Sequence, residues 1–327
     1  MDKINLKKII IGACSIAVIV ITVLSFSSLK KTAKPIVVEK VEETVEKKED
    51  KTDIIFRKAE EDLKAAKVDE AVKAMLILIN EYPGADASQK ALRKLAGLSE
   101  GEGNYAKAQY YYKRLLDDFA YIKDAAKIRS IVEDINMRIM FSPGIAEGSI
   151  EYIVQSGDSL YAIARKFKTT VELIKNVNNL GSDLIRPGQR LKIIISEFSV
   201  FVDKARNILV LKKDGQAIKT YNVSTGKDNS TPVGIFRIEE KMVKPVWYKM
   251  NAIIDPNSDK YELGERWMGL SVAGYGIHGT SDETTIGYQV TQGCVRMYNK
   301  DVVELYDIVP SGTKVEIVDG TKDVKSG

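Results

Sequence analysis

The spacing at which hydrophobic residues recur along the chain changes at residues 143–150, where the sequence reads PGIAEGSI. Before this segment, from Asp53 to Ser142, apolar residues recur at helical spacing in stretches rich in alanine, leucine, lysine and glutamate. From Phe198 onward, short alternating runs predict strands, and Asp214-Gly215 predicts a hairpin turn. Because helices and strands need different spacings of apolar residues, we expect several domains of different structural class.

The bulk composition is that of an ordinary globular protein. The 327 residues allow two or three domains, and 44% of them are apolar while 29% are charged. A net charge of +4 is too balanced to indicate a nucleic-acid partner. Two cysteines cannot form a disulfide framework, so stability must come from packing.

The N-terminal segment predicts a membrane anchor. Residues 9–29 contain no charged side chain, and about 20 apolar residues suffice to cross a bilayer. A cleaved signal peptide usually has a shorter apolar region of about 7–15 residues, and no A-x-A site follows here. We therefore expect an anchor in the cytoplasmic membrane at residues 1–30 and a charged linker at residues 31–52.

An internal sequence repeat lies within the expected helical region, residues 53–142. Residues 67–85 and 104–122 align at an offset of 37, which places Ala71 on Ala108 and Leu78 on Leu115. This pattern resembles the tetratricopeptide family, whose helical repeats stack and bind proteins. The resemblance implies a protein partner at these repeats, and a plain helical spacer is the alternative.

Residues 151–194 predict a strand, two helices and a second strand. Asp158 or Ser159 caps the first helix, and Thr169 or Thr170 begins the second. The segment resembles a LysM module, here residues 151–195, through the motifs Tyr152-x-Val154, Gly157-Asp158-Ser159-Leu160, Ile163-Ala164, Phe167, Asn178 and Gly188-Gln189-x-Leu191. The resemblance implies binding to peptidoglycan strands through a groove containing Gly157, Asp158, Ser159, Leu160 and Ile185.

The only histidine of the chain, His278, precedes Cys294 by sixteen residues, with Gly279 after the first and Gly293 before the second. An imidazole can take the proton of a thiol, and the resulting cation favours the nucleophilic thiolate. Backbone N–H groups near Gly293 and Cys294 could stabilise an oxyanion. The alternative is a buried histidine and cysteine that only pack.

Residues 197–318 resemble the L,D-transpeptidase (YkuD) catalytic domain. The resemblance is carried by TPVGIF at 231–236, YGIHGT at 275–280, Ile286-Gly287 and GCVRM at 293–297. It implies that Cys294 attacks the diaminopimelate carbonyl of a peptidoglycan tetrapeptide stem, expels D-alanine, and passes the acyl group to a neighbouring stem as a 3→3 cross-link. His278 would be the base, and the oxyanion or substrate residues would be Gly293, Arg296, Thr291, Gly279 and Tyr275.

The family pattern has a serine and a basic residue where this chain has Thr291 and Gln292. Water as acceptor would make the protein an L,D-carboxypeptidase, and another amine would make it a protein anchor. A membrane-tethered glycan-binding scaffold is the non-enzyme alternative. The chemistry requires no metal and no cofactor.

The complete expectation is a multidomain chain: an N-terminal transmembrane helix, an all-α helical-repeat region, a small βααβ LysM module and a mainly-β catalytic domain. Because the substrate wall lies outside the cytoplasmic membrane of a bacterium, we expect a single-pass anchor in the cell envelope, with the catalytic domain on the periplasmic or extracellular side.

Overall fold

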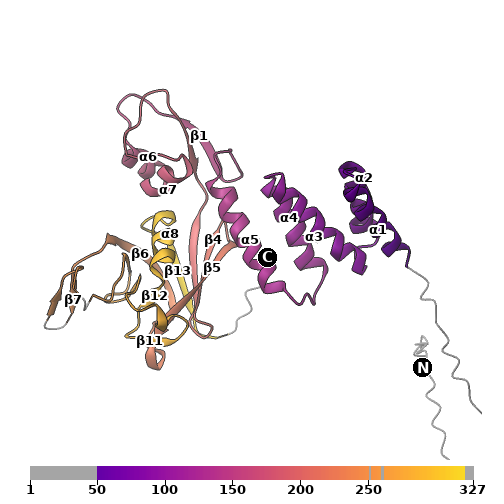
Figure 1. Ribbon diagram of the computed structural model, residues 1–327. Coiled ribbons are helices and arrows are strands. Elements are labelled where there is room, and N and C mark those ends of the chain that lie inside the picture. Colours follow the sequence, from indigo (N-terminus) through magenta and orange to yellow (C-terminus); the bar gives the residue numbers. More distant parts are fainter. Residues whose placement is uncertain (1–49, 250–251, 259–260, 321–327) are drawn as a thin grey trace, which may run out of the picture. The chain divides into compact units, whose positions relative to one another are not determined.

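The computed structural model describes residues 50–249, 252–258 and 261–320 (Figure 1). The described residues belong to one compact unit. The expected anchor at residues 1–30 and nearly all of the linker at residues 31–52 lie outside the described residues. Across the described ranges, no helix combines the length and apolar character needed to cross a bilayer.

The helical region consists of five helices, which pack in sequence order: α1 (Lys51–Lys64), α2 (Val68–Glu81), α3 (Asp86–Gly101), α4 (Tyr105–Asp118) and α5 (Ala125–Phe141). The first helix begins two residues before the expected start, because the Asp50 side chain accepts a hydrogen bond from Thr52 N–H and caps it.

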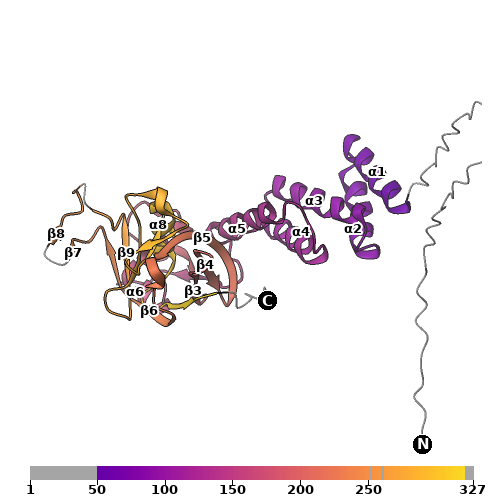
Figure 2. The same ribbon diagram turned by 90° about the horizontal axis from the view of Figure 1, so that it is seen from below.

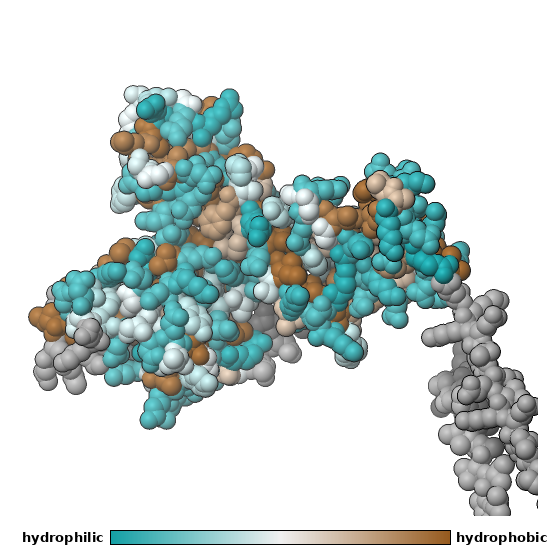
Figure 3. Space-filling view, in the orientation of Figure 1, coloured by the Kyte–Doolittle hydropathy of each residue, from teal (hydrophilic) through white to brown (hydrophobic). Residues whose placement is uncertain are grey.

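The sequence repeat maps onto equivalent faces of α2 and α4. Ala71 and Leu78 of α2 are fully buried, and so are Ala108 and Leu115 of α4. Small residues therefore face neighbouring helices at matching positions in both elements. The assignment to tetratricopeptide repeats stays a prediction, as does the expected protein partner. Figure 3 shows hydrophobic residues on the visible face only in small patches among hydrophilic ones.

The LysM-like segment confirms the predicted order of strand, helix, helix and strand: β1 (Ser149–Ile153), α6 (Leu160–Phe167), α7 (Val171–Val177) and β2 (Arg190–Ile194). The two strands pair antiparallel. Ser159 caps α6 by accepting from Ala162 N–H, and Thr170 caps α7 by accepting from Leu173 N–H. Its own small core contains Leu160, Ile163 and Ile174.

The remaining residues form a mainly-β domain, residues 198–318, which we call the β-domain (Figure 2). Its strands are β3 (Phe198–Asp203), β4 (Ile208–Lys213), β5 (Gln216–Gly226), β6 (Gly234–Val243), β7 (Trp247–Lys249), β8 (Ala252–Ile254), β9 (Arg266–Leu270), β10 (Gly276–His278), β11 (Gln289–Thr291), β12 (Val295–Met297) and β13 (Lys314–Val318). Two short 3₁₀ helices, η1 (Lys227–Asn229) and η2 (Glu283–Thr285), and one α-helix, α8 (Asn299–Ile308), complete it.

Nine of these strands form one sheet that closes into a barrel. The strand order is β11-β5-β12-β10-β9-β6-β13-β3-β4, and β4 also pairs with β5. The predicted hairpin turn joins β4 to β5, with φ of 51° at Asp214 and 80° at Gly215. The β7–β8 pair forms a separate two-stranded ribbon. Residues of α8 pack into the barrel core together with those of the strands.

Helices from the two preceding segments join the core of the β-domain. Met137 and Met140 of α5 belong to the same buried cluster as the barrel residues, and so do Leu173 and Val177 of α7. Lys192 of β2 strengthens this junction, because its ammonium group donates to the Met140 carbonyl at 2.9 Å and to the Ser142 carbonyl at 2.7 Å. Burial lowers the pKa of Lys192.

Replacing Lys192 by alanine is expected to destabilise the protein by about 1–3 kcal/mol, because two buried carbonyls at the end of α5 lose their donor. The midpoint of thermal unfolding measures the effect. Arg190→Ala on the same strand is the control, since its ion pair with Glu151 is exposed and contributes little. Equal midpoints for the two variants would contradict the proposed role.

Candidate active site

The register of two parallel strands places the predicted catalytic residues on one face. Ile277 of β10 pairs with Val295 of β12, and His278 pairs with Arg296. Ile277 and Val295 belong to the barrel core. Because side chains alternate along a strand, His278 and Arg296 point to the opposite face. Cys294 directly precedes β12, two residues before Arg296, and the charge of Arg296 acts on both the Cys294 thiol and the His278 imidazole.

Cys294 is a free, half-buried cysteine directly before β12. Its sulfur lies 3.8 Å from the Gly274 carbonyl oxygen. Burial raises the pKa of the Cys294 thiol, although the Gly276 backbone N–H and the charge of Arg296 act in the opposite direction. The thiol is therefore protonated at neutral pH.

His278 is held rigidly in a buried position. Its Nδ1 lies 2.7 Å from the Gly279 carbonyl oxygen, and its ring stacks on Trp267 with centroids 5.7 Å apart. Burial lowers its pKa to about 4, the Gly279 carbonyl raises it, Arg296 lowers it further, and the Leu263 carbonyl raises it. Since a carbonyl only accepts, the Gly279 contact favours the tautomer that carries the proton on Nδ1, in which Nε2 is the basic nitrogen.

Both members of the pair are thus neutral before substrate binds. The imidazole is unprotonated at neutral pH and free to accept a proton, while the thiol still carries one. In this unliganded state the proton therefore stays on the Cys294 sulfur, and a nucleophilic attack by that sulfur would require a base to take it.

Three further predicted residues shape the loop before Cys294. The Thr291 hydroxyl donates to the Cys294 carbonyl at 2.7 Å and accepts from Gly293 N–H at 3.2 Å. Gly293 has a φ of 128°, and a Cβ there would lie 2.5 Å from the Tyr275 ring. Glycine is required at this position because the aromatic ring occupies the space of a side chain.

Arg296 spans the same face. One of its terminal nitrogens donates to the Thr285 hydroxyl at 3.2 Å, and the other lies 3.7 Å from a Glu262 carboxylate oxygen. Its Nε is buried and has no hydrogen-bond partner among the described residues. The guanidinium therefore keeps donor capacity that a substrate carboxylate could use.

Asn299 at the start of α8 was not predicted. Its side-chain oxygen accepts from the backbone N–H of Glu265 at 3.0 Å and of Thr280 at 3.2 Å, and its nitrogen donates to the Thr280 carbonyl at 2.7 Å. A Cβ on Gly279 or on Gly264 would lie 2.2 Å from that side-chain oxygen. Gly279 is thus needed to admit the amide that ties down the segment after His278.

The residues predicted to bind glycan form a separate group in the LysM-like segment. Asp158 accepts from the Tyr152 hydroxyl and from Gln155 N–H, both at 2.8 Å. Ser159 caps α6, Leu160 is 2% exposed, and Ile185 packs beside the same small core. Gly157 has a φ of 89° in the turn before α6. These contacts give four of the five a structural role, so glycan binding by these residues stays a prediction.

The neutral resting state predicts how Cys294 reacts with iodoacetamide. In a Cys14→Ser background, alkylation is expected to be slow at pH 7 and to rise with pH toward a midpoint above the ordinary thiol value of 9.0, because only the thiolate reacts. The rate is measured by mass spectrometry, with free glutathione alongside. A rate that is already at its plateau near pH 7 would instead show a thiolate–imidazolium pair.

Two family models match the chain: the L,D-transpeptidase catalytic domain (YkuD) at residues 197–317 and the LysM domain at residues 152–193. YqjB of Bacillus subtilis, named as an L,D-transpeptidase, is 40% identical over 129 residues, which cover 38% of this chain and 72% of that protein.

YkuD of the same organism, also named as an L,D-transpeptidase, is 33% identical over 176 residues, covering 51% of this chain and 98% of that protein. A solved L,D-transpeptidase structure from Xylanimonas cellulosilytica is 26% identical, with a TM-score of 0.31, over 38% of this chain and 61% of that chain. On the strength of the two Bacillus relatives and the matching domain models, the chain belongs to the YkuD family of L,D-transpeptidases and carries a LysM domain before its catalytic domain.

Proposed function

We propose that the protein is a peptidoglycan L,D-transpeptidase that forms 3→3 cross-links through a thioester on Cys294. The observation that supports this most is the pairing of β10 with β12, in which His278 lies opposite Arg296, two residues after Cys294. The charge of Arg296 acts on both the imidazole and the thiol. Family membership supplies the donor, a tetrapeptide stem of the bacterial wall.

In the first half-reaction, the sulfur of Cys294 attacks the diaminopimelate carbonyl carbon while Nε2 of His278 takes the thiol proton. The tetrahedral intermediate collapses, the C–N bond to the terminal D-alanine breaks, and His278 returns the proton to the leaving amine. A thioester remains on Cys294.

In the second half-reaction, the side-chain amine of a neighbouring stem attacks the thioester carbonyl. His278 takes a proton from that amine, the C–S bond breaks, and the proton returns to the Cys294 sulfur. The new amide is the cross-link, and the enzyme recovers its neutral thiol and imidazole. Because burial keeps His278 neutral in the unliganded enzyme, it can act first as base and then as acid.

We assign the oxyanion donor to the backbone N–H of Cys294. The neighbouring Gly293 N–H already donates to Thr291, so Thr291 and Gly293 set the shape of the loop. Thr291 supplies the hydroxyl expected at this position. Gln292 is exposed and is uncharged, where the family pattern has a basic residue. Arg296 is the candidate for a substrate carboxylate.

We propose that the LysM domain holds the enzyme on glycan strands, and that the protein works in the bacterial cell envelope. The uncharged segment at residues 9–29 supports a single-pass anchor in the cytoplasmic membrane. The catalytic domain would then lie on the periplasmic or extracellular side, where the wall is. Water or a protein amine as acceptor remain the alternatives within the same acyl-enzyme chemistry.

Incubation of the full chain with tetrapeptide muropeptides is expected to give cross-linked dimers that have lost D-alanine, as measured by mass spectrometry. Cys294→Ala should abolish the products, and His278→Ala should lower their rate by about 100-fold or more. Tripeptides without dimers would make the enzyme a carboxypeptidase. Products that persist in Cys294→Ala would contradict the thioester route and favour the scaffold alternative.

Asn299→Ala is expected to lower kcat by about 10- to 100-fold with little change in KM, because the segment after His278 loses its two hydrogen bonds at Thr280, and Glu265 N–H loses a third, while the substrate surface remains. Alkylation of Cys294 at pH 9 should stay as in the parent, which separates a positioning role from general unfolding. Loss of kcat together with loss of the thermal unfolding transition would contradict positioning.

A further inference from the structure

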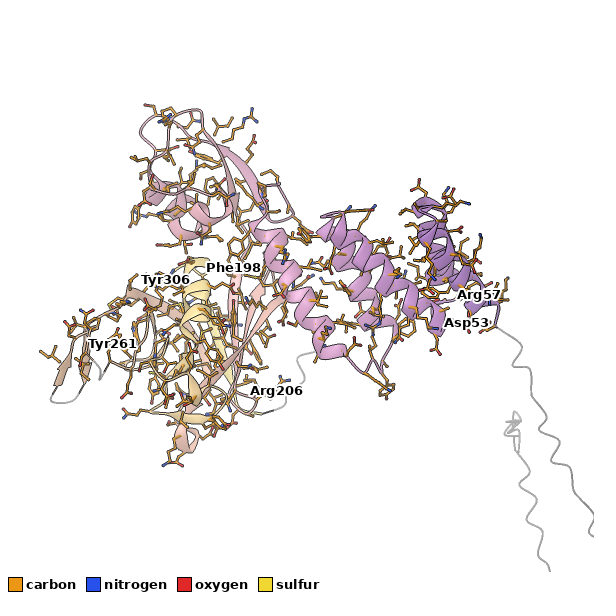
Figure 4. All side chains as sticks on the ribbon, viewed as in Figure 1. Asp53, Arg57, Phe198, Arg206, Tyr261 and Tyr306 are labelled. Atoms are coloured by element: carbon orange, nitrogen blue, oxygen red, sulfur yellow. The ribbon has the colours of Figure 1, made fainter. Side chains whose placement is uncertain are left out.

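A cavity of about 860 Å³ lies where the LysM helices meet the β-domain, and we call it the junction cleft. Its walls come from α6, from α7, from β6, from the segment that follows β2, and from the turn that precedes β13. In Figure 4 the labelled Phe198 and Tyr306 lie on this side of the β-domain, and Phe198 lines the cleft. The volume is within the range of about 300–1,000 Å³ that holds small ligands.

The junction cleft is distinct from both sites described above. It includes neither Cys294 nor His278, and none of the five residues predicted to bind glycan lines it. Strands β10 and β9 separate β12 from β6, which carries the cleft residue Arg237. Three strand spacings correspond to roughly 14 Å across the sheet.

Charged side chains of both signs line this cavity, and Glu172 among them acts electrostatically on Lys241 of the same lining. Arg165 and Lys168 contribute cations, and Glu172 and Glu197 contribute carboxylates. None of these four side chains makes an ion pair or a hydrogen bond with another residue in the described ranges. By contrast, Lys241 and Lys314 of the same lining already bind the Tyr306 carbonyl and Glu316.

A buried hydroxyl adds to the unused polar groups. Thr169 lines the cleft and is 8% exposed, yet its Oγ1 has no hydrogen-bond partner among the described residues. The rest of the lining includes the apolar side chains of Phe167, Val171 and Phe198. A ligand that suits this surface has an aliphatic body with both acidic and basic groups.

We propose that the junction cleft is a second, non-catalytic subsite that binds the zwitterionic peptide stem of the wall polymer, an inference that rests on the proposed function. Carboxylates of the stem face Arg165 and Lys168, and its side-chain amine faces Glu172 and Glu197. A polyanionic ligand, such as a glycerol-phosphate oligomer, fits less well, because the two carboxylates of the cleft repel it. The enzyme would thus hold one stem at the LysM junction while another reacts at Cys294.

The test is calorimetric titration of the full chain, with Cys294 blocked by iodoacetamide, using the free tetrapeptide stem without sugar. Blocking the thiol makes binding independent of turnover, and omitting the sugar leaves the LysM glycan groove unoccupied. We expect binding that weakens about tenfold or more in the Arg165→Gln/Lys168→Gln variant. Arg190→Gln, an exposed LysM residue outside the cleft, should bind as the parent does.

A second pair of variants distinguishes a peptide from a polyanion and guards against misfolding. Glu172→Gln/Glu197→Gln should weaken binding of the stem, whereas a glycerol-phosphate oligomer should bind these variants no less well than the parent. Stem binding unaffected by either double variant would overturn the proposal. Tighter binding of the oligomer than of the stem by the parent would overturn its peptide assignment.

The two proposals fail separately. Cross-linked products without stem binding at the cleft would retain the transpeptidase and refute the subsite. Stem binding at the cleft without Cys294-dependent products would refute the transpeptidase, and the cleft would then be a peptide-binding site of a scaffold.

Discussion

The parallel pairing of β10 with β12 is the interaction on which the active site depends. The two strands carry His278 and the residues after Cys294, and their register is locked because Ile277 and Val295 both point into the barrel core. A slip of one residue would turn the imidazole toward the core and an isoleucine toward the substrate. Hydrophobic packing on one face of these strands therefore maintains the positions of the candidate site residues on the other face.

Burial then sets the protonation states that the pairing brings together. Removal from water lowers the pKa of His278 and raises that of Cys294, so both groups rest neutral and no isolated charge has to be buried. Charge develops only when a substrate carbonyl accepts the thiolate, where a backbone N–H can stabilise it. Stacking on Trp267 and the Asn299 hydrogen bonds fix the imidazole before that moment.

Local patterns predicted the parts of the fold that are local. Residue type predicts Asp158 or Ser159 as one cap, Thr169 or Thr170 as the next helix start, and a hairpin turn at Asp214-Gly215. The structure has caps at Ser159 and Thr170 and the turn between β4 and β5. The candidate catalytic pair could be proposed from the sequence because the chain has one histidine and its flanking glycines match a family motif. Asn299 and the shared core at Met137 could not, since they depend on contacts between distant segments that leave no periodic signal. The burial that keeps His278 and Cys294 neutral is likewise visible only in the three-dimensional structure.

The most direct test of the account is the intact mass of the enzyme, quenched in acid seconds after mixing with a tetrapeptide stem. The account predicts an adduct equal to the stem less one alanine, mapped by peptide digestion to Cys294 and absent from Cys294→Ala. An adduct on another residue, or turnover of the stem with no adduct dependent on Cys294, would contradict it.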